Sequence, residues 1–307
     1  MGTSSNPYAN ILGIATAIVS TMSWQDTLTT IAEKIGQTLF GFSASINSYD
    51  ADRRIITYEA YWCTEKASQE DLDYIGHVSF LDDRPDFKML IEGRQLVESH
   101  VDDPAISEAE RSVMKEWGLK TTLDAPLIFD GKVIGTVGVA ETRFVRRFTS
   151  SELDLFAQLC ELASIGVQNA LTARGRTEVD RRLQALAMLS ETLPKASTAE
   201  AVHGEIVTAA AAAFGSPAVA ISQVQPRLDA PVVQRIHDTD LAPDARAEME
   251  RDGVAVRLLV PVASHAVDRG TLVVGWEDER RRVFNEEKTV AAIIASQAAL
   301  ALELTER

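Results

Sequence analysis

The sequence predicts two tandem copies of one domain built from both strands and helices, because one pattern occurs twice along the chain. Pro126 lies nine positions before Gly135, and Pro261 lies nine positions before Gly270. Each glycine is followed by an apolar strand, then a phenylalanine, then a helical run. A repeat unit of this length is a whole domain rather than the unit of a solenoid. The 307 residues are enough for two domains that each bury a core.

The first copy opens with helices. Residues 1–23 hold apolar side chains at a helical period, and residues 24–40 predict a second helix. Gly41 is expected to end that helix, because glycine readily takes the left-handed conformation just past a helix end. Residues 44–49 and 54–62 have the alternating or clustered apolar side chains of two strands, and we expect a hairpin there.

The middle of the first copy, residues 65–120, mixes short patterns. Residues 84–92 and 107–117 have helical spacing, and a strand fits at residues 95–98. The two strands of the repeated pattern then complete the copy.

A helix of unusual length follows, from residue 151 to about residue 193, where Pro194 ends it. A helical pattern much longer than about 25 residues is typical of a coiled coil or an interdomain connector. We expect a continuous connector that pairs with a partner chain; the alternative is two helices broken near Gly175. The apolar residues on its repeat are Leu155, Leu159, Leu162, Val179, Leu183, Leu186, Leu189 and Leu193.

The second copy is shorter in its middle segment. Its first helix is expected to end at Gly215, as that of the first copy ends at Gly41. From Gly41 to Pro126 is 85 residues and from Gly215 to Pro261 is 46, so the second copy has 39 fewer. The outer scaffold is kept, and a closing helix runs on from residue 286.

Three motifs in this order of elements resemble the GAF domain: Asp124-Ala125-Pro126-Leu127, Gly131 to Gly135, and Phe148 to Leu153. The resemblance implies an α+β fold of two tandem GAF-like domains, each a central antiparallel sheet flanked by helices, joined by a long connector helix. It places the N-terminal helix at residues 1–23, the first domain at 24–172, the connector at 173–194 and the shortened second domain at 195–307.

The resemblance also implies a site. In GAF domains the variable middle segment forms a pocket over the sheet for small ligands, so a ligand is expected within residues 42–142. The candidate ligand-binding residues are Tyr61, Cys63, His77, Phe80, Trp117, Thr121, Thr122 and Glu141. Strand alternation puts Tyr61 and Cys63 on one face, either as a pocket wall or as ordinary core. Thr121 and Thr122 could donate hydrogen bonds to a ligand, or could simply follow a helix end capped by Gly118.

Several ligand and enzyme classes are disfavoured. Cyclic-nucleotide-binding GAF domains resemble one another in an Asn-Lys pair, and this chain has Glu141-Thr142 there. GAF haem sensors carry a histidine before the third strand, and residues 107–122 contain none. A GAF-like methionine sulfoxide reductase needs paired thiols, whereas Cys63 and Cys160 are far apart. We therefore expect no enzymatic activity, and the sequence does not identify a cofactor.

The net charge of −15 and the pI of 4.8 disfavour direct binding to nucleic acid or to an anionic membrane. We also expect no membrane-spanning helix and a cytoplasmic location. By the resemblance, the partners would be a small-molecule ligand of unknown identity, a second copy of the chain in a homodimer, and an effector domain or partner protein.

We therefore expect a sensory or regulatory signalling module that binds a small molecule in its first domain and relays the event through a dimeric helix. The alternative is a ligand-free dimerisation scaffold for a separate effector such as a kinase, cyclase, phosphatase or transcription factor. A polar-lined cavity in the first domain favours the sensor, whereas a cavity filled by Trp62, Phe80, Leu96 and Trp117 favours the scaffold.

Overall fold

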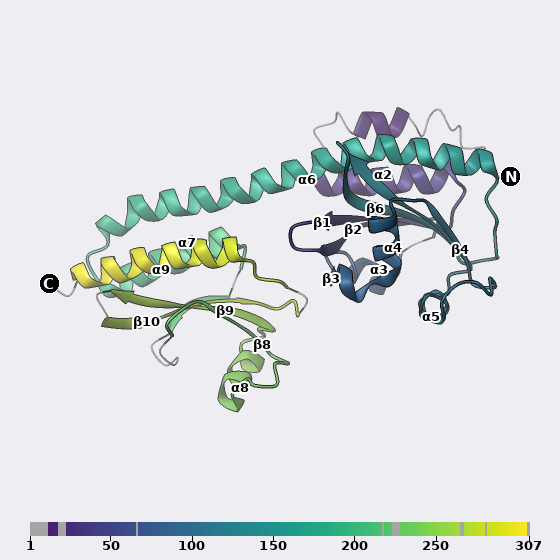
Figure 1. The fold of residues 1–307 in the computed structure, drawn as a ribbon. Helices are drawn as coiled ribbons and strands as arrows, with labels where there is room; N and C mark the ends of the chain where they lie inside the picture. The colour runs from purple at the N-terminus through teal and green to yellow at the C-terminus, as the bar shows by residue number, and fades with distance from the viewer. Residues whose placement is uncertain are drawn as a thin grey trace. The chain divides into compact units, whose positions relative to one another are not determined.

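The computed structural model describes residues 12–17, 23–65, 67–216, 218–222, 228–264, 267–279 and 281–305. The chain divides into two compact units, Met1–Gly175 and Arg176–Arg307. Each unit combines an antiparallel sheet with packed helices, so the predicted α+β fold is confirmed (Figure 1).

The first unit contains a six-stranded antiparallel sheet with the strand order β3-β2-β1-β6-β5-β4. Its strands are β1 (Ser43–Asp50), β2 (Ile55–Cys63), β3 (Val78–Phe80), β4 (Val97–His100), β5 (Thr121–Phe129) and β6 (Lys132–Glu141). Its helices are α2 (Trp24–Thr38), α3 (Gln69–Asp73), the 3-10 turn η1 (Leu81–Asp83), α4 (Pro85–Gly93), α5 (Glu108–Glu116) and the first part of α6 (Ser150–Thr192). Residues 12–17 are also helical, and most of the N-terminal helix expected at residues 1–23 lies outside the described residues.

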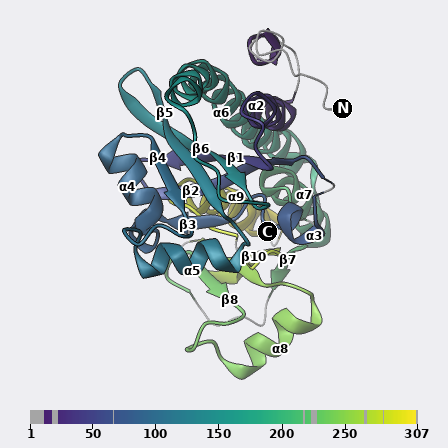
Figure 2. The ribbon, with the colours of Figure 1, turned by 90° about the vertical axis from the view of Figure 1, so that its right-hand side faces the viewer.

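The core of the first unit lies on one face of this sheet. Helices α2 and α6 run side by side over that face, while α4 and α5 lie on the opposite side (Figures 1 and 2). Ile31 of α2, Phe156 of α6 and Val137 of β6 are all fully buried in this core. We call this side of the sheet the helix face and the opposite side the lid face.

Two short elements of the middle segment were not predicted. α3 has five residues and β3 has three, which is too short for a periodic apolar pattern to show. The strand expected at residues 95–98 lies two residues later, as β4. The third strand was expected to start after Thr121 and Thr122, but both residues belong to β5, because they pair with β4 on one side and β6 on the other.

The end of α2 differs from the prediction. The left-handed residue is Phe40, with φ of 52°, and not Gly41. Gly41 is required for a different reason, since a β-carbon there would stand 2.4 Å from a methyl carbon of Val139. In the second unit the matching Gly215 does take the left-handed conformation expected of a helix cap, with φ of 60°.

α6 is one continuous helix, and the alternative of a break at Gly175 is therefore wrong. The apolar residues of α6 that were predicted to lie on a single repeat have different surroundings. Leu159 is buried in the first core and Leu189 in the second, whereas Val179 and Leu183 are 53% and 58% exposed. Substituting Leu159 would therefore disturb the core of the first unit rather than report on pairing between chains.

The second unit contains a four-stranded antiparallel sheet with the strand order β7-β10-β9-β8. Its elements are the end of α6, the 3-10 turn η2 (Leu193–Lys195), α7 (Ala199–Phe214), β7 (Ala218–Ser222), β8 (Val232–Arg235), α8 (Pro243–Arg251), β9 (Val256–Ser264), β10 (Val267–Trp276) and α9 (Asn285–Thr305). Residues of α6, α7 and α9 share one core with β9 and β10.

The second unit repeats part of the first. Its strand order corresponds to β1-β6-β5-β4, and the described residues contain no counterpart of β2 or β3. α8 corresponds to α5. Each helix is followed by a glycine in the left-handed conformation, Gly118 or Gly253. In each, the backbone N–H just after this glycine donates a hydrogen bond to the carbonyl of a methionine near the helix end, Met114 or Met249. The shorter middle segment has thus kept its last helix.

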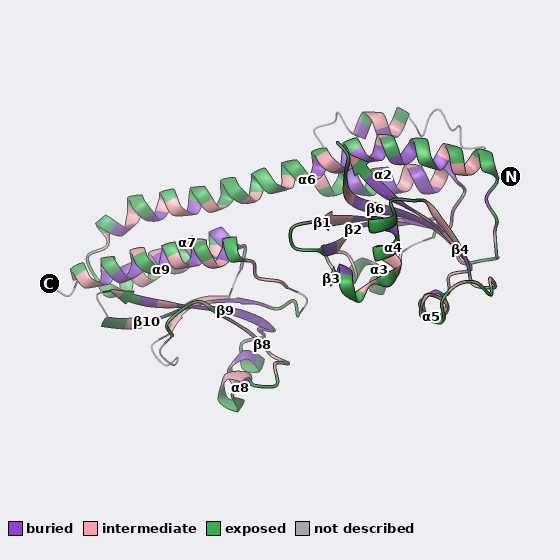
Figure 3. Cartoon of the chain, in the orientation of Figure 1, coloured by how far each residue is buried: buried purple, intermediate pink, exposed green. Residues whose placement is uncertain are grey.

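One described helix, α9, is long and apolar enough to cross a membrane by length and composition. Ala291, Ile294, Ala298 and Leu302 of this helix are buried in the second core, which accounts for much of its apolar composition (Figure 3). No membrane-spanning helix was expected from the sequence.

Candidate functional site

A row of small and polar residues crosses the lid face of the first sheet. Asp124 of β5 pairs with Gly138 of β6, Gly138 pairs with Ser45 of β1, and Ser45 pairs with Tyr61 of β2. Gly138 leaves room for its neighbours, because a β-carbon there would stand 2.4 Å from Oδ1 of Asp124 and 3.5 Å from Oγ of Ser45. A polar side chain in the middle of an apolar sheet therefore has space to stand above it.

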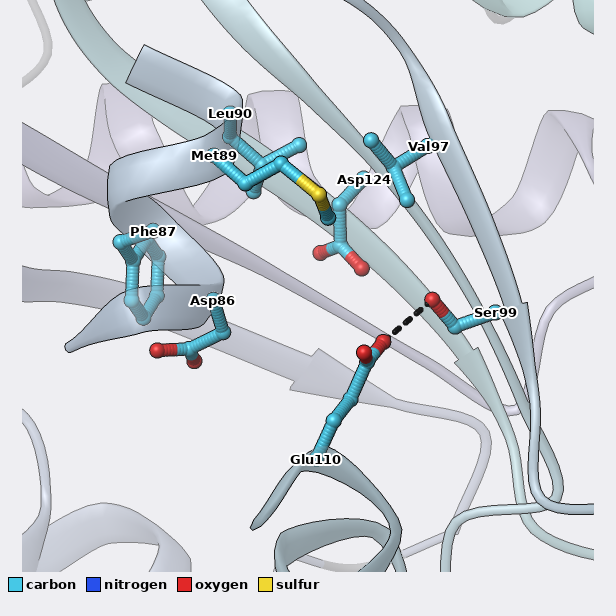
Figure 4. Close-up of a pocket in the computed structure, with 8 residues that line it drawn as sticks. All are labelled: Asp86, Phe87, Met89, Leu90, Val97, Ser99, Glu110 and Asp124. Atoms are coloured by element: carbon cyan, nitrogen blue, oxygen red, sulfur yellow. Dashed lines mark hydrogen bonds between the residues drawn. The ribbon is translucent and has the colours of Figure 1, made fainter. Parts of the chain in front are cut away.

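Asp124 lies at the base of a pocket between the sheet, α4 and α5 (Figure 4). The pocket volume is about 60 Å³, which leaves room for a few water molecules or a small organic group. Its lining residues are Asp86, Phe87, Met89 and Leu90 of α4, Val97 and Ser99 of β4, Glu110 of α5, and Asp124 of β5. Half of these side chains are apolar and half are polar, and three of the polar ones are acids.

The pKa of Asp124 is raised to about 7, chiefly by burial and to a smaller extent by the negative charges of Asp86 and Glu110. A hydrogen bond from Thr122 acts in the opposite direction. The Asp124 side chain is only partly buried, since one side of it faces the pocket. The carboxyl group is therefore poised to bind a proton, or to pair with a positive group that enters the pocket.

The other two acids already have partners. Asp86 accepts two hydrogen bonds from Arg84, at 3.1 and 2.8 Å, and the Arg84 guanidinium lies over the ring of Phe87. Glu110 accepts a hydrogen bond from Ser99 Oγ at 2.5 Å (Figure 4). Of the three lining acids, Asp86 is thus paired with a cation, whereas the partners of Glu110 and Asp124 among the described residues are hydroxyl groups, those of Ser99 and Thr122.

A cluster of aromatic rings covers the neighbouring part of the lid face. The Tyr74 ring stacks on His77 at 4.5 Å and meets Tyr58 and Trp117 edge-on at 5.1 and 5.3 Å between centroids. Two predicted site residues, His77 and Trp117, therefore come together, with Trp117 still 41% exposed.

The remaining predicted residues lie elsewhere on the first unit. Tyr61 bonds to Ser43 and Cys63, and burial raises the pKa of the Tyr61 hydroxyl to about 12. Burial also raises the pKa of Cys63, whose Sγ donates to the Glu65 carbonyl. Phe80 is 45% exposed at the sheet edge.

Thr121 and Glu141 form structural contacts at the far end of β5 and β6. Thr121 Oγ1 bonds to His100 Nδ1 and to the Arg146 backbone. Glu141 is buried and accepts several hydrogen bonds from Arg143, including one of 2.8 Å from Nε. Thr122 is the predicted residue that acts on the pocket, through its hydrogen bond to Asp124.

None of the eight predicted residues is among the residues that line the pocket. Sequence reasoning missed Asp86, Ser99, Glu110 and Asp124. Asp124 did carry a signal, because an aspartate interrupts an otherwise apolar strand in the repeated pattern, where the second copy has Leu259. Asp86 and Glu110 resemble ordinary acids in the first turn of a helix, and only the fold brings them to one place.

Two kinds of chemistry find no support in the described part of the chain. No group of three or more His, Cys, Asp or Glu side chains there is arranged to hold a metal ion. Burial raises the pKa of both Cys63 and Cys160, which keeps the two thiols protonated.

Residues 23–167 match the family model of the GAF domain. The whole chain is similar in fold to a crystal structure of the bacteriophytochrome RpBphP3 from the photosynthetic bacterium R. palustris. That similarity has a TM-score of 0.55 at 10% identity and covers 99% of this chain and 76% of the other.

Two GAF domains from cyanobacterial phytochromes are also similar. One binds phycoerythrobilin and the other phycocyanobilin, at 13% and 16% identity, each with a TM-score of 0.46. Both matches cover 55% of this chain, and 97% and 98% of those domains. None of the curated proteins matches the chain in sequence.

The family match of residues 23–167 supports a sensory or regulatory module. The match to the GAF family model lies within the first unit, Met1–Gly175.

Proposed function

We propose that this protein is a non-enzymatic cytoplasmic sensor that binds a small molecule in the pocket above Asp124. The observation that carries the proposal is the pocket itself, which joins Asp124, an acid whose partner among the described residues is the Thr122 hydroxyl rather than a cation, to apolar walls from α4 and β4. Small-molecule sites in proteins have this composition, with a few polar groups in an apolar setting. The protonated thiols support a role without nucleophilic catalysis.

The pocket favours a ligand with a positive or hydrogen-bond-donating head and a small apolar body. Three carboxyl groups face one space, so an anion would add a further negative charge to it. Phe87, Leu90 and Val97 offer an apolar surface to the rest of the ligand. A small organic ammonium or guanidinium ion satisfies both requirements.

A bilin does not fit this pocket. A linear tetrapyrrole is far larger than a cavity of about 60 Å³ and carries carboxylate groups of its own, which Asp86, Glu110 and Asp124 would repel. The similarity to bilin-bound GAF domains therefore concerns the fold, and we propose a different ligand class for this chain.

The scaffold alternative receives less support from the side chains that were expected to fill the site. Trp62 lies on the helix face, where its ring is close to Gly36, and Leu96 packs against the helix-face core. Phe80 and Trp117 are both partly exposed. Half of the side chains that line the pocket are polar, and polar lining is the arrangement that favours a sensor.

We also propose that the protein forms a homodimer through α6 and acts on an effector domain or partner protein. Val179 and Leu183, spaced four residues apart, leave an exposed apolar strip on the part of α6 in the second unit. Strips with three- and four-residue spacing pair helices in coiled coils. A ligand would act by binding the two states of such a pair with different affinity.

The test of ligand binding uses butylammonium and compares it with butyrate and butanol, which carry a similar alkyl chain but an anionic or a neutral head group. Butylammonium should raise the unfolding midpoint of the first unit, and butyrate should not, because only the cation pairs with Asp124. Asp124→Asn should remove the effect, whereas Asp130→Asn, a change of the same charge on an exposed hairpin, should keep it. An equal response to butyrate, or no response to any probe, contradicts the proposal. A native mass spectrum of the purified protein would show in addition whether a ligand co-purifies.

A further inference from the structure

Glu59 occupies an unusual position in the first sheet. In the β1–β2 ladder, Asn47 pairs with Tyr58 and Ile46 pairs with Ala60, so Glu59 is the extra residue of a β-bulge. Its carboxylate is 3% exposed, and an acid is rarely buried so completely without partners. The bulge therefore places a buried charge on β2.

Arg174 of α6 is the partner of this charge. Its Nη1 atom donates to both carboxylate oxygens of Glu59, at 2.8 and 3.0 Å, and Ser48 Oγ donates to the same carboxylate at 2.6 Å. The Arg174 guanidinium also lies 4.8 Å from the ring centroid of Trp24, at the start of α2. One side chain thus joins α6 to the sheet and to α2.

The contact comes where the apolar packing of α6 in the first unit ends. Ala170 is its last buried residue there, and the residues from Thr172 to Gly175 are exposed or half-buried. Gly175 follows at once, and glycine weakens a helix interior. The last turn of α6 in this unit is therefore held by a charge pair rather than by core packing.

The bulge also adjoins the lid face. Tyr58, next to Glu59, bonds to Ser45, the residue that faces Gly138 and Asp124 in the polar row. The Tyr58 ring meets Tyr74 of the aromatic cluster. A displacement of the polar row would therefore be passed to the bulge through two residues, Ser45 and Tyr58.

We propose that Glu59 and Arg174 form a clamp that fixes α6 where it leaves the first domain, and that this clamp couples the helix to the pocket. The coupling rests on the proposed function, whereas the clamp itself does not. Contiguity alone does not show coupling, so the two claims need separate readouts.

Hydrogen exchange of the full chain, followed by mass spectrometry, tests the clamp without any ligand. Arg174→Gln should speed exchange of the amides of residues 171–178 at least ten-fold, while the β1 and β6 amides stay as in the wild type. Arg176→Gln removes the same charge from an exposed neighbour and should leave exchange unchanged. Unchanged exchange in Arg174→Gln would overturn the clamp. If exchange in the strands also becomes faster, a second variant is needed. Arg174→Lys keeps the charge but lacks the planar group over Trp24, so it should speed amide exchange less, and only in α6. No faster exchange in α6 of Arg174→Lys would overturn the clamp.

A double-mutant cycle tests the coupling. Asp124→Asn should change exchange at residues 171–178 in the wild-type background and have no effect there in the Arg174→Gln background. No effect in either background, or the same effect in both, would overturn the coupling. Loss of the butylammonium response with the exchange results intact would instead reject only the proposed ligand.

Discussion

Asp124 stands directly against Gly138, so that a β-carbon at residue 138 would lie 2.4 Å from its Oδ1 atom. The two residues are paired across β5 and β6, and the missing side chain of one makes the space for the carboxyl group of the other. The pocket acid and this glycine therefore form one structural unit.

We expect Gly138→Ala to force the Asp124 carboxyl group out of its position. The short aspartate side chain has little freedom to move, so the first unit should lose about 1–3 kcal/mol of unfolding free energy, in the range of overpacked sites. Urea unfolding measures the loss. In an Asp124→Ala background the same substitution should cost much less, because the clashing oxygen is gone. Gly93→Ala is the matched control, since a β-carbon there meets nothing within 4 Å.

The raised pKa of Asp124 predicts that the stability of the first unit falls as pH rises. The folded protein holds this proton up to about pH 7, whereas the unfolded chain releases it near pH 4. Between these values the folded state binds more protons, so the unfolding free energy decreases with pH and levels off above pH 7. Each unit by which the pKa rises is worth about 1.4 kcal/mol.

The measurement is urea unfolding at several pH values in a Trp276→Phe background. Three of the four tryptophans, Trp24, Trp62 and Trp117, lie in the first unit, so this background makes fluorescence report on that unit alone. Asp124→Asn should flatten the profile between pH 4 and 7, and Asp130→Asn should not. A profile that is equally steep in Asp124→Asn would assign the dependence to other groups.

The two glycines of the repeated pattern should respond to alanine for different reasons. A β-carbon at Gly135 would lie 2.1 Å from the Asn47 carbonyl oxygen, and a backbone atom in a sheet does not move aside. Gly270 instead has φ of 116°, a conformation that alanine rarely adopts. We expect Gly135→Ala to cost more than about 3 kcal/mol in the first unit, and Gly270→Ala to cost about 1–3 kcal/mol in the second. Calorimetry separates the two units if each melts in its own transition, and a mild Gly135→Ala would contradict the close approach.

The proposed homodimer makes a prediction at Leu183. This residue is 58% exposed, so Leu183→Glu should leave the second core intact while placing a charge in the strip that pairs with the second copy. Sedimentation equilibrium should show dimer dissociation at a concentration at least ten-fold higher than for the wild type. Gln184→Glu adds the same charge next to it on a different side of the helix and should have little effect. Equal dissociation of both variants, or of neither, would place the dimer contact elsewhere.

The outer scaffold could be predicted from the sequence because its signals are local. Three signals can be recognised without knowledge of the fold: the proline and glycine of the repeated pattern, the apolar strands after them, and the long helical period of α6. α8 has few apolar residues and a charged face, so its helical pattern is weak, and it becomes recognisable as the counterpart of α5 only once both sheets are formed. The positive φ of Phe40 has no sequence signature, since a large side chain there opposes the usual preference.

The site was harder to predict than the scaffold for a related reason. Asp86, Glu110 and Asp124 come from three elements separated by up to 38 residues, and each has an ordinary explanation where it stands. The eight residues predicted from the sequence, among them Cys63, His77 and Glu141, lie outside the lining of this pocket. The space above Gly138 is what distinguishes Asp124 from the other aspartates, and it becomes visible only in the folded sheet.

Gly175 provides the last prediction, on the helix that leaves the first domain. A β-carbon there would meet nothing within 4 Å, and its φ is not in the left-handed region. Gly175→Ala should therefore stabilise α6 by about 1 kcal/mol, the difference between the two residues in a helix interior. Amide exchange in residues 173–180 should slow by about five-fold, with no change in the strands of either sheet. If the clamp and the glycine act on the same opening of the helix, Gly175→Ala should also recover part of the protection that Arg174→Gln removes. Faster exchange in Gly175→Ala would mean that the helix at this point depends on the absence of a side chain, and hence that a neighbour approaches it in solution.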